Sequence, residues 1–154
     1  MPFIEAARQL KWDLGEKNTL FIHLTLIPYL ASAGELKTKP TQHSVKQLSE
    51  SGIQPDILVC RTEHPIPQEM KKKIGLFCNV SEADVIEARD ASTIYEVPLL
   101  MQNERLDSRV LYKLDIYNDK EANLKNWTNF LTKLQNPKFE INVGLIGKYV
   151  ELKD

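Results

Sequence analysis

Residues 19–27 read Thr-Leu-Phe-Ile-His-Leu-Thr-Leu-Ile, and this stretch, which Pro28 closes, decides the fold class. Nearly all of its residues are apolar or β-branched, which predicts a strand that is buried on both faces. Strands of this kind are typical of parallel sheets that helices cover on both sides. We interpret His23, inside the stretch, as a hydrogen-bonded strand histidine and not as a ligand.

Helices and strands alternate on both sides of this segment. The apolar spacing of residues 3–14 predicts a first helix, which Gly15 ends in a left-handed cap. Pro40 opens a second predicted helix, which Gly52 closes. Residues 56–60, Asp-Ile-Leu-Val-Cys, then predict a second short buried strand.

A third helix and a third strand complete the pattern. The helix carries Met70, Ile74 and Phe77, and residues 85–88 form the strand. The alternation predicts an α/β fold: a doubly wound, mostly parallel sheet with helices on both faces. Ligands of such folds bind beyond the carboxyl ends of the strands. The segments expected there are residues 29–40, 61–67 and 89–93.

The C-terminal part has a different pattern. Residues 121–134 predict a late helix with one apolar stripe, and Asn136-Pro137 ends it. Residues 138–146 have strand character, but no partner strand follows them in the chain. We therefore interpret them as the first strand of another domain.

Composition excludes several classes of function. The chain has 154 residues, and 20 Lys+Arg against 21 Asp+Glu give a net charge of −1. This balance lacks the positive surface expected of proteins that bind nucleic acid or anionic membranes. No apolar run reaches the roughly 18 residues of a membrane span, and no secretory signal is recognised. We expect a cytoplasmic protein with no nucleic-acid or membrane partner.

Two cysteines, Cys60 and Cys78, have no CxxC spacing and no nearby pair of histidines. This pattern favours two reduced, buried thiols over a metal or redox site. The sequence also has no GxxxxGKS or GxxxxGKT phosphate loop, because the glycines of residues 144–148 have the wrong spacing. No Ser/His/Asp set or carboxylate pair is identified as catalytic.

The stretch 37–42, Lys-Thr-Lys-Pro-Thr-Gln, has the clearest chemical meaning. In an extended chain Lys37 and Lys39 point to the same side. Pro40 at the first helical position leaves the next three N–H groups unpaired. Those groups belong to Thr41, Gln42 and His43. Two cations beside a helix start predict a polyphosphate site.

A solvated basic loop before a Pro-capped helix is the alternative reading of this stretch. Its position after the first buried strand favours a site. The run Lys71-Lys72-Lys73 has the same ambiguity, and only Lys72 or Lys73 is expected to face inward. The residues therefore predict a binding half-site without a reaction centre.

Five separated blocks closely resemble CTP synthases, and they occur in the order of that family. One block contains Lys-Thr-Lys-Pro-Thr-Gln, and another reads Lys-Lys-Ile-Gly-Leu-Phe-Cys-Asn-Val. The blocks span residues 24–29, 34–46, 52–61, 72–80 and 143–154.

The resemblance implies a ligase of pyrimidine nucleotide biosynthesis that makes CTP from UTP, ATP and glutamine. ATP, with Mg²⁺, activates the 4-oxygen of UTP as a phosphate ester, and ammonia displaces it. A separate amidotransferase domain supplies the ammonia. The resemblance also implies activation by GTP, inhibition by CTP and a homotetramer.

The resemblance further implies which residues of this chain bind nucleotides. Those for UTP or CTP are Lys37, Thr38, Lys39, Pro40, Thr41, Gln42 and Lys73. Those for the adenine end of ATP are Arg89, Asp90 and Ala91. No catalytic residue and no magnesium ligand of the family matches a residue of this chain.

The resemblance implies three regions. Residues 1–118 match the C-terminal part of the synthetase (amidoligase) domain, which is similar to P-loop NTPases but here lacks the P-loop. Residues 119–137 match a linker helix, and residues 138–154 match the first strand of the glutamine amidotransferase domain. We expect this chain alone to be inactive. A non-catalytic nucleotide-binding or oligomerisation module is the alternative.

Overall fold

A computed structural model describes residues 2–117, 120–148 and 150 of the chain. They form two compact units, divided between Asn123 and Leu124. The elements of the first unit are α1 (Pro2–Leu14), η1 (Glu16–Asn18), β1 (Ile22–Leu26), β2 (Tyr29–Leu30), β3 (Glu35–Leu36), α2 (Lys39–Glu50), β4 (Ile57–Thr62), α3 (Gln68–Cys78), η2 (Glu82–Asp84), β5 (Val85–Arg89), η3 (Ile94–Glu96), α4 (Val97–Asn103) and α5 (Leu106–Lys113). The second unit contains α6 (Lys125–Gln135).

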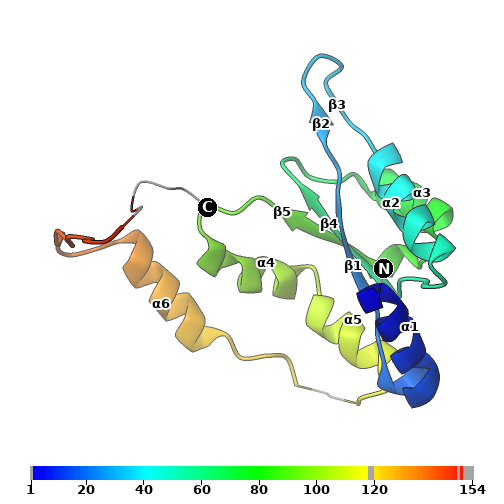
Figure 1. Cartoon of the computed structure of the whole chain (residues 1–154). Helices are drawn as coiled ribbons and strands as arrows, with labels where there is room; N and C mark the ends of the chain where they lie inside the picture. The colour runs from blue at the N-terminus through cyan, green and yellow to red at the C-terminus, as the bar shows by residue number, and fades with distance from the viewer. Residues whose placement is uncertain (1, 118–119, 149, 151–154) are drawn as a thin grey trace. The chain divides into compact units, whose positions relative to one another are not determined.

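A parallel three-stranded sheet in the order β1-β4-β5 lies at the centre of the first unit (Figure 1). Alternate side chains of β4 face opposite sides. Leu58 and Cys60 pack with residues of α2 and α3, whereas Ile57 and Val59 pack with residues of α4 and α5. The predictions of an α/β fold and of a parallel sheet between helices are confirmed.

β1 is an edge strand, and the prediction that both of its faces are buried is wrong. Ile22, Leu24 and Leu26 share one face and are 46%, 66% and 55% exposed. The apolar residues of α4 and α5 that reach this side of the sheet pack on β4 and β5. The other face of β1 packs against α2, and there Ile27, just after the strand, is buried. An apolar run shows that a strand is suited to burial, but not where it lies in the sheet.

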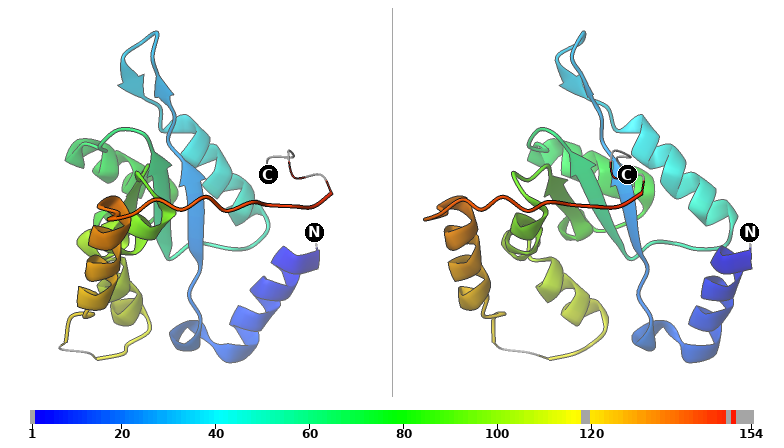
Figure 2. Two further views of the ribbon diagram at one scale, coloured as in Figure 1. Left: turned by 90° about the vertical axis from the view of Figure 1, so that its left-hand side faces the viewer. Right: turned by 60° about the vertical axis from the view of Figure 1, so that its left-hand side comes forward.

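A β2–β3 hairpin, within the segment 29–40 that the sequence predicts beyond the strand ends, projects beyond the carboxyl end of β1 (Figure 2). Gly34 closes its turn with a φ of +64°, and its N–H donates to the carbonyl of Leu30 at 2.8 Å. The ring of Tyr29 lies 4.1 Å from the ring of His64, which follows β4. The hairpin thus contacts the segment beyond the neighbouring strand.

α1 ends where the sequence predicts, but Gly15 has φ 84° and ψ 158°, a positive-φ conformation that favours glycine but is not the predicted left-handed helical cap. His23 lies 2.8 Å from the Ser44 hydroxyl, and burial lowers the pKa of the imidazole. Cys60 and Cys78 are free and buried, and desolvation raises the pKa of each thiol to about 11. His23 is thus confirmed as a hydrogen-bonded strand residue, and Cys60 and Cys78 as buried free thiols.

In the second unit, α6 confirms the late helix, with the rings of Trp127 and Phe130 5.6 Å apart. The predicted strand at 138–146 is not formed, and most of its apolar side chains are exposed. An extended segment without a neighbouring strand has no partners for its backbone hydrogen bonds. The domain boundary predicted at 118/119 lies outside the described residues. The same holds for residues 149 and 151–154 of the last predicted region.

Candidate functional site

The segments that follow β1, β4 and β5 meet at the carboxyl edge of the sheet, because the strands are parallel. The N–H of Ile27 donates to the carbonyl of Arg61 at 2.8 Å. The N–H of Asp90 donates to the carbonyl of Thr62 at 3.0 Å. These bonds fix the starts of the loops relative to one another, as expected for a ligand site in this fold class.

The start of α2 differs by one residue from the prediction. Thr38 is the N-cap, and its carbonyl accepts a hydrogen bond from the N–H of Gln42 at 3.1 Å. The helix therefore begins at Lys39, and the prediction of a free N–H at Gln42 is wrong. The donors that precede this first helical bond are the N–H groups of Lys39 and Thr41.

Two threonines of the predicted site have structural contacts. Thr41 is fully buried, and its hydroxyl lies 3.1 Å from the Leu26 carbonyl and 3.1 Å from the Thr25 hydroxyl. The hydroxyl of Thr38 accepts a hydrogen bond from Nε2 of Gln42 at 3.2 Å. These contacts hold α2 against β1 and leave the backbone of Thr41, not its hydroxyl, to face a ligand.

The lysines of the stretch have different surroundings. The backbone N–H of Lys37 donates to the carbonyl of Pro28 at 2.9 Å, which fixes the chain where it leaves the hairpin. The Lys37 ammonium forms an ion pair with the Glu35 carboxylate. Lys39 and Pro40 are exposed at the helix start. Lys37 and Lys39 therefore lie on either side of the α2 N-cap in the chain, where cations favour the binding of an anion at a helix start.

Lys71, and neither Lys72 nor Lys73, is the inward member of its run. Its side chain is 15% exposed, and its ammonium lies 2.6 Å from the carboxylate of Glu104. The buried positions of α3 include Ile74 and Cys78, so the helix phase turns residue 71 inward. Lys73 is exposed on α3, and its charge, after that of Lys37, lowers the pKa of Glu35.

A hollow lies beyond β5 and has a volume of about 490 Å³. Its mostly apolar lining carries an exposed ion pair in which Arg61 Nε lies 3.2 Å from Asp90 Oδ1. An apolar pocket with a guanidinium suits a flat heteroaromatic ring, on which arginine stacks. The lining residues are Leu24, Arg61, Ala88, Arg89, Asp90, Ala91, Ile94, Val97, Leu100 and Met101.

Comparison with known proteins decides the family. The family described as "CTP synthase N-terminus" matches residues 1–116. This chain belongs to the CTP synthase family. It is 62% identical over 154 residues to the CTP synthase of Cytophaga hutchinsonii and 61% identical to that of Flavobacterium johnsoniae. It is 55% identical to the CTP synthase of Methanocaldococcus jannaschii.

The whole chain is covered in each of these matches, but only 28–29% of each CTP synthase. The chain thus spans less than a third of the length of its relatives. Among residues 2–117, 120–148 and 150, no group of three or more His, Cys, Asp or Glu side chains lies close enough to hold a metal ion. No helix of the described part is long and apolar enough to cross a membrane.

The residues that the CTP synthase resemblance assigns fall in two places. Those of 37–42 lie at the start of α2, with Lys73 on the neighbouring α3. Arg89, Asp90 and Ala91 line the hollow beyond β5. The resemblance did not include Arg61 in the adenine group, although the sequence placed it in a segment that follows a strand. The signal that could have identified Arg61 was its position at the carboxyl end of β4, where it is the last-but-one residue.

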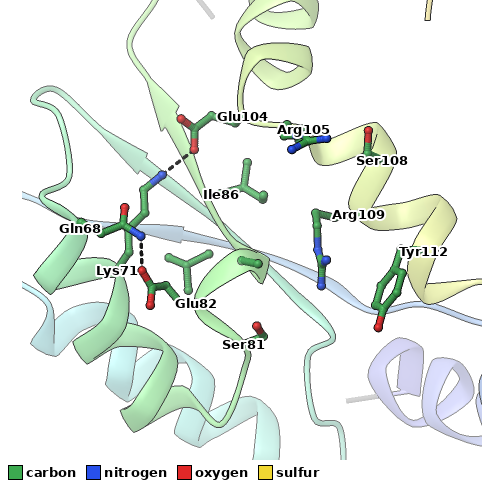
Figure 3. Close-up of a pocket in the computed structure, with 12 residues that line it drawn as sticks. Gln68, Lys71, Ser81, Glu82, Ile86, Glu104, Arg105, Ser108, Arg109 and Tyr112 are labelled. Carbon is green, nitrogen blue, oxygen red and sulfur yellow. Dashed lines mark hydrogen bonds and ion pairs between the residues drawn. The ribbon is translucent and has the colours of Figure 1, made fainter. Parts of the chain in front are cut away.

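Another hollow, of about 600 Å³, lies between α3, η2 and α5, away from the residues that the family resemblance assigns (Figure 3). Several of its charged side chains have structural partners. Lys71 pairs with Glu104, which also accepts a hydrogen bond from the N–H of Glu87 at 3.0 Å. Arg109 on α5 pairs with the buried Asp84. These contacts hold α3 and α5 beside β5, and we assign this hollow no ligand.

Proposed function

We propose that this chain binds the triphosphate of UTP, or of CTP as inhibitor, within a CTP synthase that aminates UTP. The observation that carries the proposal is the pair of lysines, Lys37 and Lys39, on either side of the α2 N-cap, where the N–H groups of Lys39 and Thr41 precede the first helical hydrogen bond. The charge of Lys73, on α3, also acts on this segment. A helix terminus adds only about 0.3–1 kcal/mol for a surface anion, so the lysines supply most of the attraction. Pro40 and the buried hydroxyl of Thr41 fix the helix start that carries them.

The hollow beyond β5 is proposed to hold the adenine ring of ATP. Arg89, Asp90 and Ala91 lie at its edge, and Leu24 and Met101 are among its apolar lining. Such a lining buries a planar base, and backbone groups after β5 provide polar contacts at its rim. The placement keeps both nucleotides at the carboxyl edge of one sheet.

The proposed reaction transfers a phosphoryl group from ATP to the 4-oxygen of UTP, after which ammonia from glutamine displaces the phosphate. The residues of this chain bind and orient the two nucleotides. Mg²⁺, which neutralises charge on the phosphates of ATP, is proposed to be held by residues outside this chain. GTP activation, the glutamine amidotransferase, the homotetramer and the cytoplasmic location are proposals that follow from the family.

Exposed apolar surface supports the proposal that the chain works within a longer protein. The row Ile22, Leu24 and Leu26 leaves one face of the edge strand β1 uncovered. We propose that further sequence of the synthetase domain covers it and completes a doubly wound, P-loop NTPase-like sheet around residues 1–118. The free edge of β1 is suited to pairing with a further strand, and its apolar face is suited to a covering helix.

The C-terminal regions are proposed to be the linker helix, at 119–137, and the start of the amidotransferase domain, at 138–154. Apolar side chains recur at every second position from residue 139 to 145, the period of a strand. All four are more than three-quarters exposed here: Phe139, Ile141, Val143 and Leu145. We propose that they pair when the rest of that domain is present.

Transplanting this chain tests the proposed function. A chimaera in which it replaces the matching segment of the Cytophaga hutchinsonii CTP synthase is expected to aminate UTP with ammonia and ATP. The purified 154-residue chain is expected to show no turnover. A chimaera that folds but is inactive would support the alternative of a non-catalytic module, which family membership does not favour. Turnover by the 154-residue chain alone would refute the proposal that its reaction centre is missing.

Arg61→Ala in the same chimaera is expected to raise KM for ATP by about tenfold, with little change in KM for UTP. The reason is the loss of a stacking and hydrogen-bonding guanidinium, which is typically worth about 1–2 kcal/mol. Lys46→Ala, an exposed change on α2, is the matched control. An unchanged KM for ATP would exclude Arg61 from the adenine pocket.

A further inference from the structure

We propose that Glu35 is an internal counter-ion that competes with the nucleotide triphosphate for Lys37 and Lys73 and so sets the affinity of the UTP/CTP site. This inference rests on the proposed function, because it assumes that the triphosphate binds at these lysines. It assigns a role to a hairpin that the family resemblance leaves without one.

The hairpin determines where the Glu35 carboxylate lies. Leu36 packs against the buried core on the α2 and α3 side of the sheet. Because side chains alternate along an extended chain, Glu35 and Lys37 lie on the same side of this segment, where they form their ion pair. The Gly34 turn and the hydrogen bond from Lys37 N–H to the Pro28 carbonyl hold both ends of this short segment.

The charges around Glu35 make it a competitor and not a passive neighbour. Its carboxylate pairs with the Lys37 ammonium, and the hydrogen bond and charge of Lys37 lower the pKa of Glu35. The charge of Lys73 lowers it further, so the carboxylate stays ionised at neutral pH. The Glu35 carboxylate therefore offsets the charge of Lys37, with which it pairs, and acts on Lys73 only through its charge.

The ion pair is weak enough to exchange. The side chains of Lys37 and Glu35 are 41% and 56% exposed, and water competes strongly for such pairs. The Lys37 ammonium has three protons to donate, but a phosphate oxygen on the same ammonium lies close to the Glu35 carboxylate, and the two anions repel each other. Binding of a triphosphate is therefore opposed by Glu35 and favours its displacement from Lys37.

Lys39 provides an internal comparison. In the described part of the chain it has no ion pair, whereas Lys37 has one. Removing the carboxylate should thus strengthen the contribution of Lys37 and Lys73 and leave that of Lys39 as it is. A weakened site has a functional consequence, because a nucleotide that is held less tightly by its phosphates leaves faster.

Glu35→Gln in the full-length chimaera tests the inference by calorimetric titration with UTP and with CTP at low ionic strength. We expect the dissociation constants of UTP and of CTP to fall about three- to tenfold. This is the scale expected when an exposed ion pair and its repulsion of the phosphates are removed. The gain should shrink at high salt. Uridine, which has no phosphate, should bind equally to both proteins, and Glu50→Gln at the far end of α2 is the matched control.

A double-mutant cycle locates the effect. The gain from Glu35→Gln should fall by more than half in a Lys37→Ala background and persist in a Lys39→Ala background. Unchanged or weaker triphosphate binding in Glu35→Gln and in Glu35→Ala overturns the inference. If Lys37→Ala itself leaves UTP binding unchanged, the proposed function fails; if it weakens binding while Glu35→Gln has no effect, only the role of Glu35 fails.

Discussion

Lys37→Ala or Lys39→Ala in the full-length chimaera should raise the UTP concentration for half-maximal rate by about 10- to 100-fold. Each change removes a charge-assisted contact to the triphosphate, worth about 1.5–3 kcal/mol. The backbone that positions each lysine is fixed independently, by the Pro28 carbonyl for Lys37 and by the α2 start for Lys39. The loss should therefore appear in nucleotide binding and not in folding.

Two measurements separate this effect from general damage. Glutamine hydrolysis, measured at saturating UTP, should be largely unchanged, because no lysine of this site is proposed to contact glutamine. Lys46→Ala removes an exposed lysine from the same helix and should leave the UTP requirement unchanged. Normal UTP dependence in both Lys37→Ala and Lys39→Ala would remove the triphosphate assignment.

The place of a strand in the sheet was predictable where the strand's own residues determine it. β4 is a continuous apolar run, and it lies at the centre of the sheet as such a run predicts. β1 has a similar run but lies at an edge of the sheet. Strand order depends on which strands pair with one another, and the residues of β1 do not specify its partners. The β2–β3 hairpin was missed since each of its strands has only two residues.

The candidate site shows the same limit. Chemistry and position singled out 37–42, but the helix start was misplaced by one residue because Thr38, and not Lys39, accepts the first helical hydrogen bond. A run of three lysines does not show which of them faces inward. The buried residues Ile74 and Cys78, on the same face of α3, show that Lys71 does. The nucleotide roles came from resemblance, since two lysines and a helix start are not by themselves specific.

Asp84→Ala should lower the free energy of unfolding of the 154-residue chain by about 2–4 kcal/mol, measured by thermal or urea unfolding. Asp84 is fully buried just before β5, with Arg109 at 2.8 Å from Oδ1 and Lys113 at 2.8 Å from Oδ2. The two cations lie one turn apart on α5, so a single carboxylate fixes that helix to the sheet. Removing it leaves both cations beside an apolar gap.

The side chains of Arg109 and Lys113 are about a quarter exposed, so they regain part of their hydration and the loss stays below that of a sealed ion pair. Glu5→Ala removes an exposed pair with Arg8 and should cost less than about 1 kcal/mol. Replacing Asp84, Arg109 and Lys113 together by leucine should restore most of the stability, because no charge is then left unpaired. If Asp84→Ala costs no more than Glu5→Ala, packing of the apolar face of α5, and not this carboxylate, holds the helix in place.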